Sequence, residues 1–145
     1  MTFLRPTVFL AAFSTTGKSP VNGKTDTCAG VRVGVEEKMK TWVLPFKSAT
    51  MNQAALLGLK FGIVAISTKH RDNLLIKTDS KYVERTLEQK NGKFSFKPES
   101  NIDLVTEIRD MISKVNGCTV TVAPADKDVA ELREKIRVIG KKRLA

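Results

Sequence analysis

The sequence predicts an α/β fold, in which a mixed five-stranded sheet carries helices packed on it. Two observations predict this class. Three apolar, strand-like runs come first in the chain, and after them strand-like runs alternate with segments of helical periodicity. Successive strands favour a meander, whereas strands separated by helices favour parallel pairing, so the expected order is βββαβααβα. We expect one domain over residues 1–145, with a basic tail from about residue 140.

The first three strands are predicted at residues 7–13, 29–35 and 41–46. The first run is apolar throughout, which is typical of a buried strand, and the valines of the second run alternate with other residues. Pro45 indicates that the third strand ends there or lies at an edge of the sheet, because proline cannot donate to a strand ladder. The link at residues 36–40 favours a hairpin between the second and third strands.

The helices are predicted at residues 49–68, 80–89, 101–115 and 126–139, with strands at residues 73–78 and 119–122. Glycines at positions 58 and 62 weaken the first helix but permit close packing against a sheet. The expected buried faces comprise Ala54, Leu57, Gly58, Phe61, Ala65 and Ile66 in the first helix, Leu104, Ile108, Met111, Ile112 and Val115 in the third, and Val129, Leu132, Ile136 and Ile139 in the fourth.

The balance of charge favours a polyanionic partner. The chain carries 25 Lys and Arg against 15 Asp and Glu, a net charge of +10, and such an excess attracts nucleic acid, acidic membranes or acidic proteins. The two cysteines and the single histidine have no zinc-site spacing. The first apolar run is too short for a membrane span, which needs about 18 residues. We therefore expect an intracellular protein without a metal, a cofactor or a membrane partner.

Four segments carry motifs in a definite order. The apolar run to Ser14, with Ala-Gly-Val after the next loop, resembles the first strand and glycine-rich loop of the ribonuclease H family. TMNQAAL at residues 50–56 resembles the family's T-N-x-R-x-E-L helix start, and LLIKTDSKYV at residues 74–83 resembles its strand ending in T-D-S-x-Y-V. KPESNIDL at residues 97–104 resembles its K-x-V-x-N-x-D-L segment. The resemblance covers nearly the whole chain and implies a ribonuclease H-like fold.

The resemblance also indicates which catalytic acids are missing. The family hydrolyses phosphodiesters with two metal ions, which take oxygen ligands from four acidic residues. Its first-strand Asp falls on Ala12 and its first-helix Glu falls on Ala55, so two of the four acids are absent. Asp79 is a clear remnant, and either Asp128 or Glu131 matches the last acid. The resemblance therefore implies that Ala12, Ala55, Asp79 and Asp128 converge at one end of the sheet. We therefore expect a protein that is not an enzyme.

Three alternatives bear on this expectation. Asp26, in the loop before the second strand, is a candidate substitute for the lost Asp. The two alanines could be laboratory substitutions, although Phe13 in place of the family's Gly, and the absence of the family's His loop, favour natural loss. Asp79 could be a structural remnant, because the Thr-Asp-Ser sequence around it can cap the following helix.

The basic residues concentrate where the family binds duplex backbone. Residues 60–97 hold nine Lys or Arg against four Asp or Glu. Lysines can neutralise phosphates and phenylalanines can stack on exposed bases, although both phenylalanines of this region could instead pack inward. Two polar residues fall where the family reads the minor groove of an RNA–DNA hybrid. The predicted nucleic-acid-binding residues are Lys18, Lys24, Asn52, Gln53, Ser80, Lys81, Arg85, Lys90, Lys93, Phe94, Phe96 and Lys97.

The sequence thus predicts a non-catalytic protein that binds nucleic acid, with RNA or an RNA–DNA hybrid favoured. Removing two acids also removes negative charge that would repel phosphate, so the altered centre can receive a nucleic-acid backbone without metal. Two alternatives stay open. One is a structural subunit that binds other proteins, and the other is a residual metal-dependent ribonuclease that uses Asp79, Asp128 and Asp26.

Overall fold

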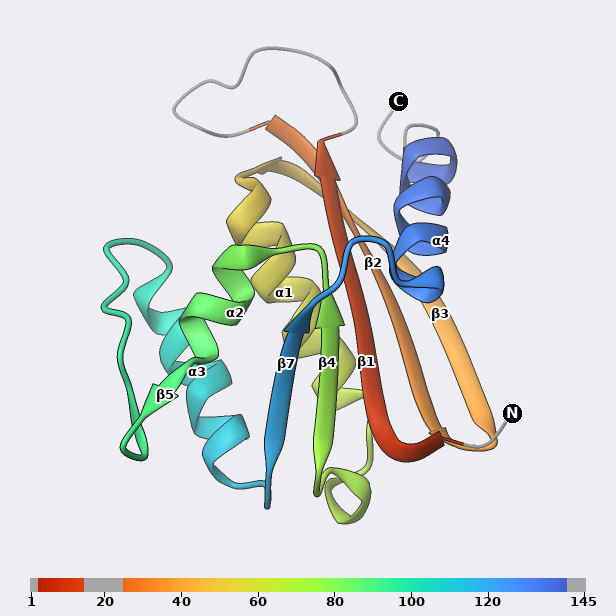
Figure 1. The fold of residues 1–145 in the computed structure, drawn as a ribbon. Helices are drawn as coiled ribbons and strands as arrows, with labels where there is room; N and C mark the ends of the chain where they lie inside the picture. The colour runs from red at the N-terminus through yellow and green to blue at the C-terminus, as the bar shows by residue number, and fades with distance from the viewer. Residues whose placement is uncertain (1–2, 15–24, 141–145) are drawn as a thin grey trace.

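The computed structural model describes residues 3–14 and 25–140 of the chain. Lys18, Lys24 and the basic tail beyond residue 140 lie outside these ranges. The described residues form a mixed five-stranded sheet, as the sequence predicted, and its strands lie in the order β3-β2-β1-β4-β7 (Figure 1). Its strands are β1 (Phe3–Ser14), β2 (Thr25–Glu36), β3 (Lys38–Ala49), β4 (Leu74–Thr78) and β7 (Cys118–Val122).

The sheet combines a meander with parallel strands. Strands β1, β2 and β3 pair antiparallel, whereas β4 pairs parallel with both β1 and β7. Pro45 indicated that this strand either ends there or lies at an edge of the sheet. Strand β3 does lie at an edge, and it continues past Pro45 to Ala49. The hairpin turn is tighter than the predicted link, because Val35 already pairs with Lys38.

Helices cover both faces of the sheet. They are α1 (Met51–Val64), α2 (Lys81–Leu87), α3 (Ile102–Ser113) and α4 (Lys127–Lys135), with a 3-10 turn at Thr68–His70 and a π-helical turn at Ile136–Gly140. A small hairpin of β5 (Gln89–Lys90) and β6 (Lys93–Phe94) follows α2. Helices α1, α2 and α3 lie on one face, and α4 lies on the other (Figure 1). No helix among the described residues is long and apolar enough to cross a membrane.

Strand β1 separates two cores because its side chains alternate between the faces. Val8 and Leu10 pack with α1 and α3, whereas Phe9 and Ala11 pack with the apolar stripe of α4. All four are buried. Burial on both faces explains why the first apolar run of the sequence has no polar alternation.

The buried face of α1 differs from the predicted one. Leu57 is half-buried and Ala65 is exposed. Phe61 is 37% exposed, and its ring packs edge-on against Trp42 at 5.1 Å between centroids. The helix also ends at Val64 rather than at residue 68. The prediction failed because α1 is apolar on most sides, so its periodicity does not select one face. The buried residues of α1 are Ala54, Ala55, Leu56, Gly58, Leu59, Gly62 and Ile63.

Close packing at Gly58 determines that face. A Cβ atom at this position would lie 2.8 Å from both the Ala29 Cβ and the Leu10 Cδ1 atoms. On the other face, a Cβ atom at Gly30 would lie 3.0 Å from Ile136 Cγ2. Glycine therefore allows α1 and α4 to approach the sheet closely, as predicted for Gly58.

We expect the substitution Gly58→Ala to destabilise the protein. Its methyl group would overpack the interface, at a cost of about 1–3 kcal/mol, which exceeds the gain of up to about 1 kcal/mol in helix propensity. Urea unfolding followed by circular dichroism measures the difference. The control is Val64→Ala on the exposed side of α1, which should change the free energy of unfolding by about 0.5 kcal/mol or less. A Gly58→Ala variant as stable as the parent would contradict this account.

Candidate functional site

A hollow of about 400 Å³ lies where β1 and β4 end beside the first turns of α1 and α2. We call it the β1–β4 hollow. It brings together Ala12, Ala55 and Asp79, as the sequence predicted, together with Asn52 and Ser80. The complete lining is Ala12, Phe13, Met51, Asn52, Ala55, Asp79, Ser80 and Arg133.

The parallel pairing of β1 with β4 places the residues of the hollow. Leu10 lies opposite Thr78, and the backbone N–H of Asp79 donates to the carbonyl oxygen of Leu10 at 3.4 Å. Asp79 therefore follows the last paired residue of β4, beside Ala12. Both Ala12 and Ala55 are buried, at 7% and 1% exposure, so each presents only a methyl group.

The Thr-Asp-Ser sequence caps α2, but Asp79 does not act as the cap. The Ser80 hydroxyl accepts from the backbone N–H of Val83 at 3.2 Å, and the Thr78 hydroxyl accepts from the N–H of Ser80 at 3.1 Å. The capping function that the sequence indicated is thus performed by the residues on either side of Asp79. The Asp79 carboxylate is directed to the hollow instead.

Arg133 is the partner of Asp79 in the hollow. Its Nε atom lies 3.5 Å from the Asp79 Oδ2 atom, and the Asp79 side chain is only 11% exposed. Burial raises the pKa of the Asp79 carboxyl, although the charge of Arg133 and the backbone N–H groups of Ala12 and Asp79 oppose this. The hollow therefore contains one carboxylate and one guanidinium.

Two solved structures resemble this chain over nearly its whole length. Ribonuclease H1 from the halophilic archaeon Halobacterium salinarum NRC-1 has a TM-score of 0.62 at 16% identity, over 94% of this chain and 98% of that one. The N-terminal ribonuclease H domain of rv2228c from Mycobacterium tuberculosis, solved as a fusion with maltose-binding protein, has a TM-score of 0.62 at 17% identity, over 97% and 99%. The fold is that of ribonuclease H. No protein-family model matches the sequence, and no curated protein matches it significantly.

The side chains of the β1–β4 hollow do not fit the two metal ions that the ribonuclease H family uses. Two divalent cations close together need several carboxylate ligands, and Ala12 and Ala55 supply none. Asp79 is the one carboxylate of the lining, and it faces an arginine. Within residues 3–14 and 25–140, His, Cys, Asp and Glu form no group of three that could hold a metal ion.

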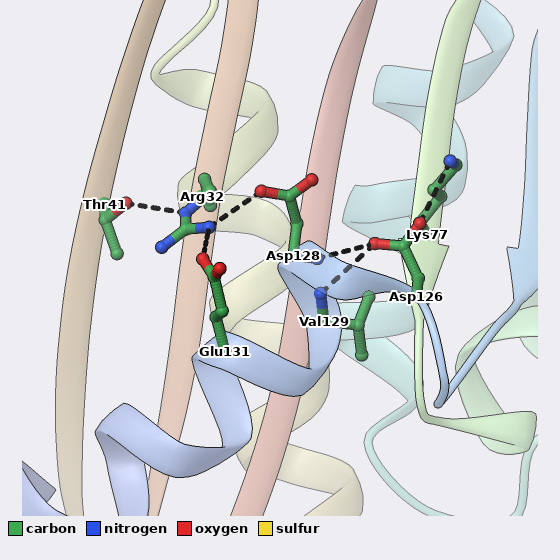
Figure 2. A network of polar contacts seen from close by, with 7 residues as sticks. All are labelled: Arg32, Thr41, Lys77, Asp126, Asp128, Val129 and Glu131. Atoms are coloured by element: carbon green, nitrogen blue, oxygen red, sulfur yellow. Dashed lines mark hydrogen bonds and ion pairs between the residues drawn. The ribbon is translucent and has the colours of Figure 1, made fainter.

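The expectation that Asp128 converges on the hollow is wrong, and neither Asp128 nor Glu131 lines it. Figure 2 shows both carboxylates bound to Arg32 of β2, each with an oxygen 2.7 Å from the Nη1 atom. The Arg32 Nε atom also donates to the Thr41 hydroxyl at 2.9 Å. The two candidates for the last acid therefore bind an arginine of the sheet.

Arg32 is a buried charge, with 4% exposure. Burial opposes its ionisation, but the hydrogen bonds and charges of Glu131 and Asp128 overcome this effect and raise the pKa of Arg32. The hydrogen bond from Arg32 lowers the pKa of Glu131. The sequence contained a signal for this contact, since an arginine among alternating valines needs an acidic partner. The two partners lie 96 and 99 residues away, which the pattern could not identify.

Asp26 does not substitute for the lost acid in the hollow. It belongs to β2 rather than to the preceding loop, which corrects the prediction. Its carboxylate accepts from the backbone N–H of Ser48 at 3.2 Å, and Asp26 is not among the lining residues. This acid therefore contributes to the junction of β2 and β3.

The basic segment at residues 60–97 does not form one cationic surface. Lys60 pairs with Glu107 at 2.7 Å, Lys77 pairs with Asp126 at 3.2 Å, and Arg71 donates to the Ile66 carbonyl. These three cations are already bound within the protein. The exposed cations among the predicted binding residues are Lys81, Arg85, Lys90, Lys93 and Lys97, on α2, the β5–β6 hairpin and the segment after it.

Phe94 and Phe96 pack inward, which is the alternative to base stacking that the sequence left open. Both are half-buried. The Arg109 guanidinium lies 4.8 Å from the Phe94 ring centroid, and Phe96 contacts Tyr82 edge-on at 6.1 Å and lies under Arg85 at 5.5 Å. Arg109 also donates to the Phe96 carbonyl at 2.6 Å. The rings thus have partners in the protein, which does not favour base stacking.

Asn52 and Gln53 have different environments in the first turn of α1. Asn52 is exposed and lines the hollow, whereas Gln53 is half-buried and does not line it. The backbone N–H of Gln53 donates to the Thr50 hydroxyl, which caps the helix. Asn52 is therefore better placed to contact a ligand in the hollow.

Asp126 begins α4 and gives the fold a pH-dependent contact. Its carboxylate accepts from the backbone N–H groups of Asp128 and Val129 and pairs with Lys77 (Figure 2). Burial acts to raise the pKa of Asp126, but these partners outweigh it and lower the pKa. A carboxyl whose pKa is lowered by folding stabilises the protein above its unfolded pKa, and this stabilisation is lost as pH falls through the folded pKa.

We therefore expect Asp126→Asn to destabilise the protein at neutral pH but not in acid. Asparagine keeps the helix cap and removes the charge, so the loss should be about 1 kcal/mol at pH 7. The difference from the parent should shrink as pH falls below about 4, the ordinary value for an aspartate. Urea unfolding at a series of pH values measures it. A difference that is constant with pH would show that the charge of Asp126 does not contribute.

Proposed function

We propose that this protein binds nucleic acid, RNA or an RNA–DNA hybrid, without cleaving it. The observation that carries the proposal is the β1–β4 hollow, where Ala12 and Ala55 stand at two acid positions of the resemblance and Arg133 pairs with the remaining Asp79. The two structural neighbours described above are named as ribonuclease H proteins. Their fold supports a nucleic-acid ligand, and the altered side chains support the loss of hydrolysis.

The loss of hydrolysis follows from the chemistry of the donor set. Attack on a phosphodiester needs hydroxide, and free water has a pKa of about 15.7, whereas water on a catalytic metal ion has a pKa of about 7. One carboxylate that already faces a guanidinium cannot hold two such ions. With Asp128 and Glu131 bound to Arg32, the fourth helix supplies no acid to the hollow.

Binding is supported by charge. The chain has a net charge of +10, and the exposed lysines of α2 and the β5–β6 hairpin form no ion pair with another residue that the structure describes. Lysines that neutralise phosphates release counterions, so affinity falls steeply with salt. The five exposed cations are Lys81, Arg85, Lys90, Lys93 and Lys97.

We expect binding to a fluorescein-labelled RNA–DNA hybrid in EDTA at low salt. Fluorescence anisotropy measures it, with single-stranded RNA and duplex DNA in parallel titrations. The combined substitution of Lys90, Lys93 and Lys97 by alanine should reduce the slope of log affinity against log salt by about one for each phosphate that the variant no longer neutralises. Absence of binding to all three probes at low salt would refute the proposal.

We expect no cleavage of the same hybrid in Mg²⁺ or Mn²⁺. A residual ribonuclease is the alternative, and denaturing gel electrophoresis of the labelled strand tests it. Asp79→Asn serves as the matched control, because it removes the remaining carboxylate with little change in shape. Turnover in the parent that Asp79→Asn abolishes would establish the nuclease and overturn the non-catalytic function.

The second candidate function is a subunit that binds other proteins. The observation that favours it is the apolar outer side of α1, where Leu57, Phe61 and Val64 border a hollow of about 330 Å³. Phe61 and Val64 are exposed, and exposed apolar patches often mark protein interfaces. A protein that binds none of the three nucleic-acid probes, but associates in sedimentation velocity until Phe61→Ser is introduced, would support this candidate.

A further inference from the structure

We propose that Arg133 occupies the place of a catalytic metal ion and binds a phosphate of the nucleic-acid backbone, while Asp79 orients its guanidinium. The inference rests on the proposed function and identifies the group that receives the ligand. It concerns the one cation in the lining of the β1–β4 hollow. No acidic residue of α4 reaches that hollow, whereas Arg133 of the same helix does.

The packing of α4 directs Arg133 to the hollow. Val129, Leu132 and Ile136 form the buried stripe on the sheet. Residues three apart share a side of a helix, so Asp128 and Glu131 lie together on one flank of this stripe, where Arg32 binds them. A residue two positions after Glu131 projects from the opposite flank. The contact with Arg32 thus fixes the rotation of α4 that carries Arg133 toward Asp79.

The guanidinium of Arg133 is available to a ligand. Its contact with Asp79 uses the Nε atom, and Asp79 is its one ion-pair partner within the part of the chain that the structure describes. The side chain is 48% exposed, and it also borders a second hollow of about 320 Å³, where Glu134 pairs with Arg137. The carboxylate of Glu134 disfavours an anion on that side, so the terminal nitrogens of Arg133 are available to an anion that enters the β1–β4 hollow.

Arginine is suited to this ligand. Its planar fork donates two parallel hydrogen bonds to phosphate, and it remains charged in all ordinary conditions. Asn52 and Ser80 add polar groups to the same lining. The Ser80 hydroxyl accepts from Val83, so its own proton remains able to donate to a phosphate oxygen.

The arginine differs from a metal ion in two respects that matter for function. It belongs to the chain, so phosphate binding does not depend on dissolved cations and is insensitive to a chelator. It also has no coordination sites for water, so it attracts the phosphate without generating hydroxide. Together with the alanines at positions 12 and 55, this cation accounts for binding without hydrolysis.

The charge of Asp79 gives the sharpest test. If Arg133 binds phosphate, Asp79 competes with the ligand for the guanidinium. Asp79→Asn keeps an oxygen that can accept from Nε and removes that competing charge, so affinity should rise about three- to tenfold in EDTA. If the hollow instead holds a metal ion, the same substitution removes its ligand and lowers affinity in Mg²⁺. The two hypotheses predict opposite signs.

The experiment measures anisotropy of the fluorescein-labelled hybrid with the full chain, in EDTA and in Mg²⁺, over a salt series. We expect Arg133→Ala to weaken binding about tenfold or more and to lower the salt slope by about one. Arg133→Lys keeps the charge but loses the planar fork, so its affinity for the hybrid should lie between those of the parent and of Arg133→Ala. The matched control is Lys135→Ala, an exposed cation of the same helix that does not line the hollow, and it should change affinity less than about twofold.

The outcomes separate this inference from the proposed function. A parent protein that fails to bind refutes both. A parent that binds, while Arg133→Ala behaves like Lys135→Ala, refutes the role of Arg133 and leaves nucleic-acid binding in place. Weaker binding by Asp79→Asn also refutes the role of Arg133. Thermal unfolding checks that each variant is folded, and if Arg133→Ala is not, the sign of the Asp79→Asn effect decides.

Discussion

The structure depends on the double burial of β1. This strand pairs antiparallel with β2 and parallel with β4, and its side chains belong alternately to the two cores. A shift of its register by one residue would exchange Leu10 and Phe9 between cores of different shape. The register is therefore fixed, and it places Ala12 beside the end of β4, where Asp79 follows the last paired residue.

A second constraint comes from burying Arg32. A buried guanidinium needs acidic partners, because desolvation of an unpaired charge costs several kcal/mol (roughly 3–5). Asp128 and Glu131 provide them, which attaches the start of α4 to β2 and withdraws both acids from the β1–β4 hollow. Asp128 and Glu131 thus hold α4 against β2, whereas Arg133 of the same helix lines the hollow. The contact of the two acids with Arg32 sets the rotation of α4 and therefore which of its residues reaches Asp79.

Local patterns were sufficient to predict the class and the order of the main elements, and the family resemblance predicted the convergence of Ala12, Ala55 and Asp79. Strands and helices have distinct periods, and the Thr-Asp-Ser segment marks the end of β4. The first three strands were predicted too short, because backbone pairing continues through polar residues such as Lys38 and Lys40. Those residues carry no apolar signal. Other features depend on contacts that no local pattern contains. The buried side of α1 is selected by the close approach at Gly58, whereas the sequence of that helix is apolar on most sides.

The position of Arg133 depends on the rotation of α4, and the family resemblance was ambiguous between Asp128 and Glu131 at that point. In the structure both acids bind Arg32 and neither lines the hollow, where Arg133 pairs with Asp79 instead. The pair of Asp79 and Arg133 also bears on how readily metal-dependent chemistry could be introduced into this fold. A carboxylate placed at position 12 would share the lining of the hollow with the Arg133 guanidinium, whose positive charge opposes the binding of a divalent cation. Selection for cleavage would then have to replace the arginine before any added acid could bind metal. The pair of Asp79 and Arg133 is therefore an obstacle to metal binding in the hollow in addition to the two alanines.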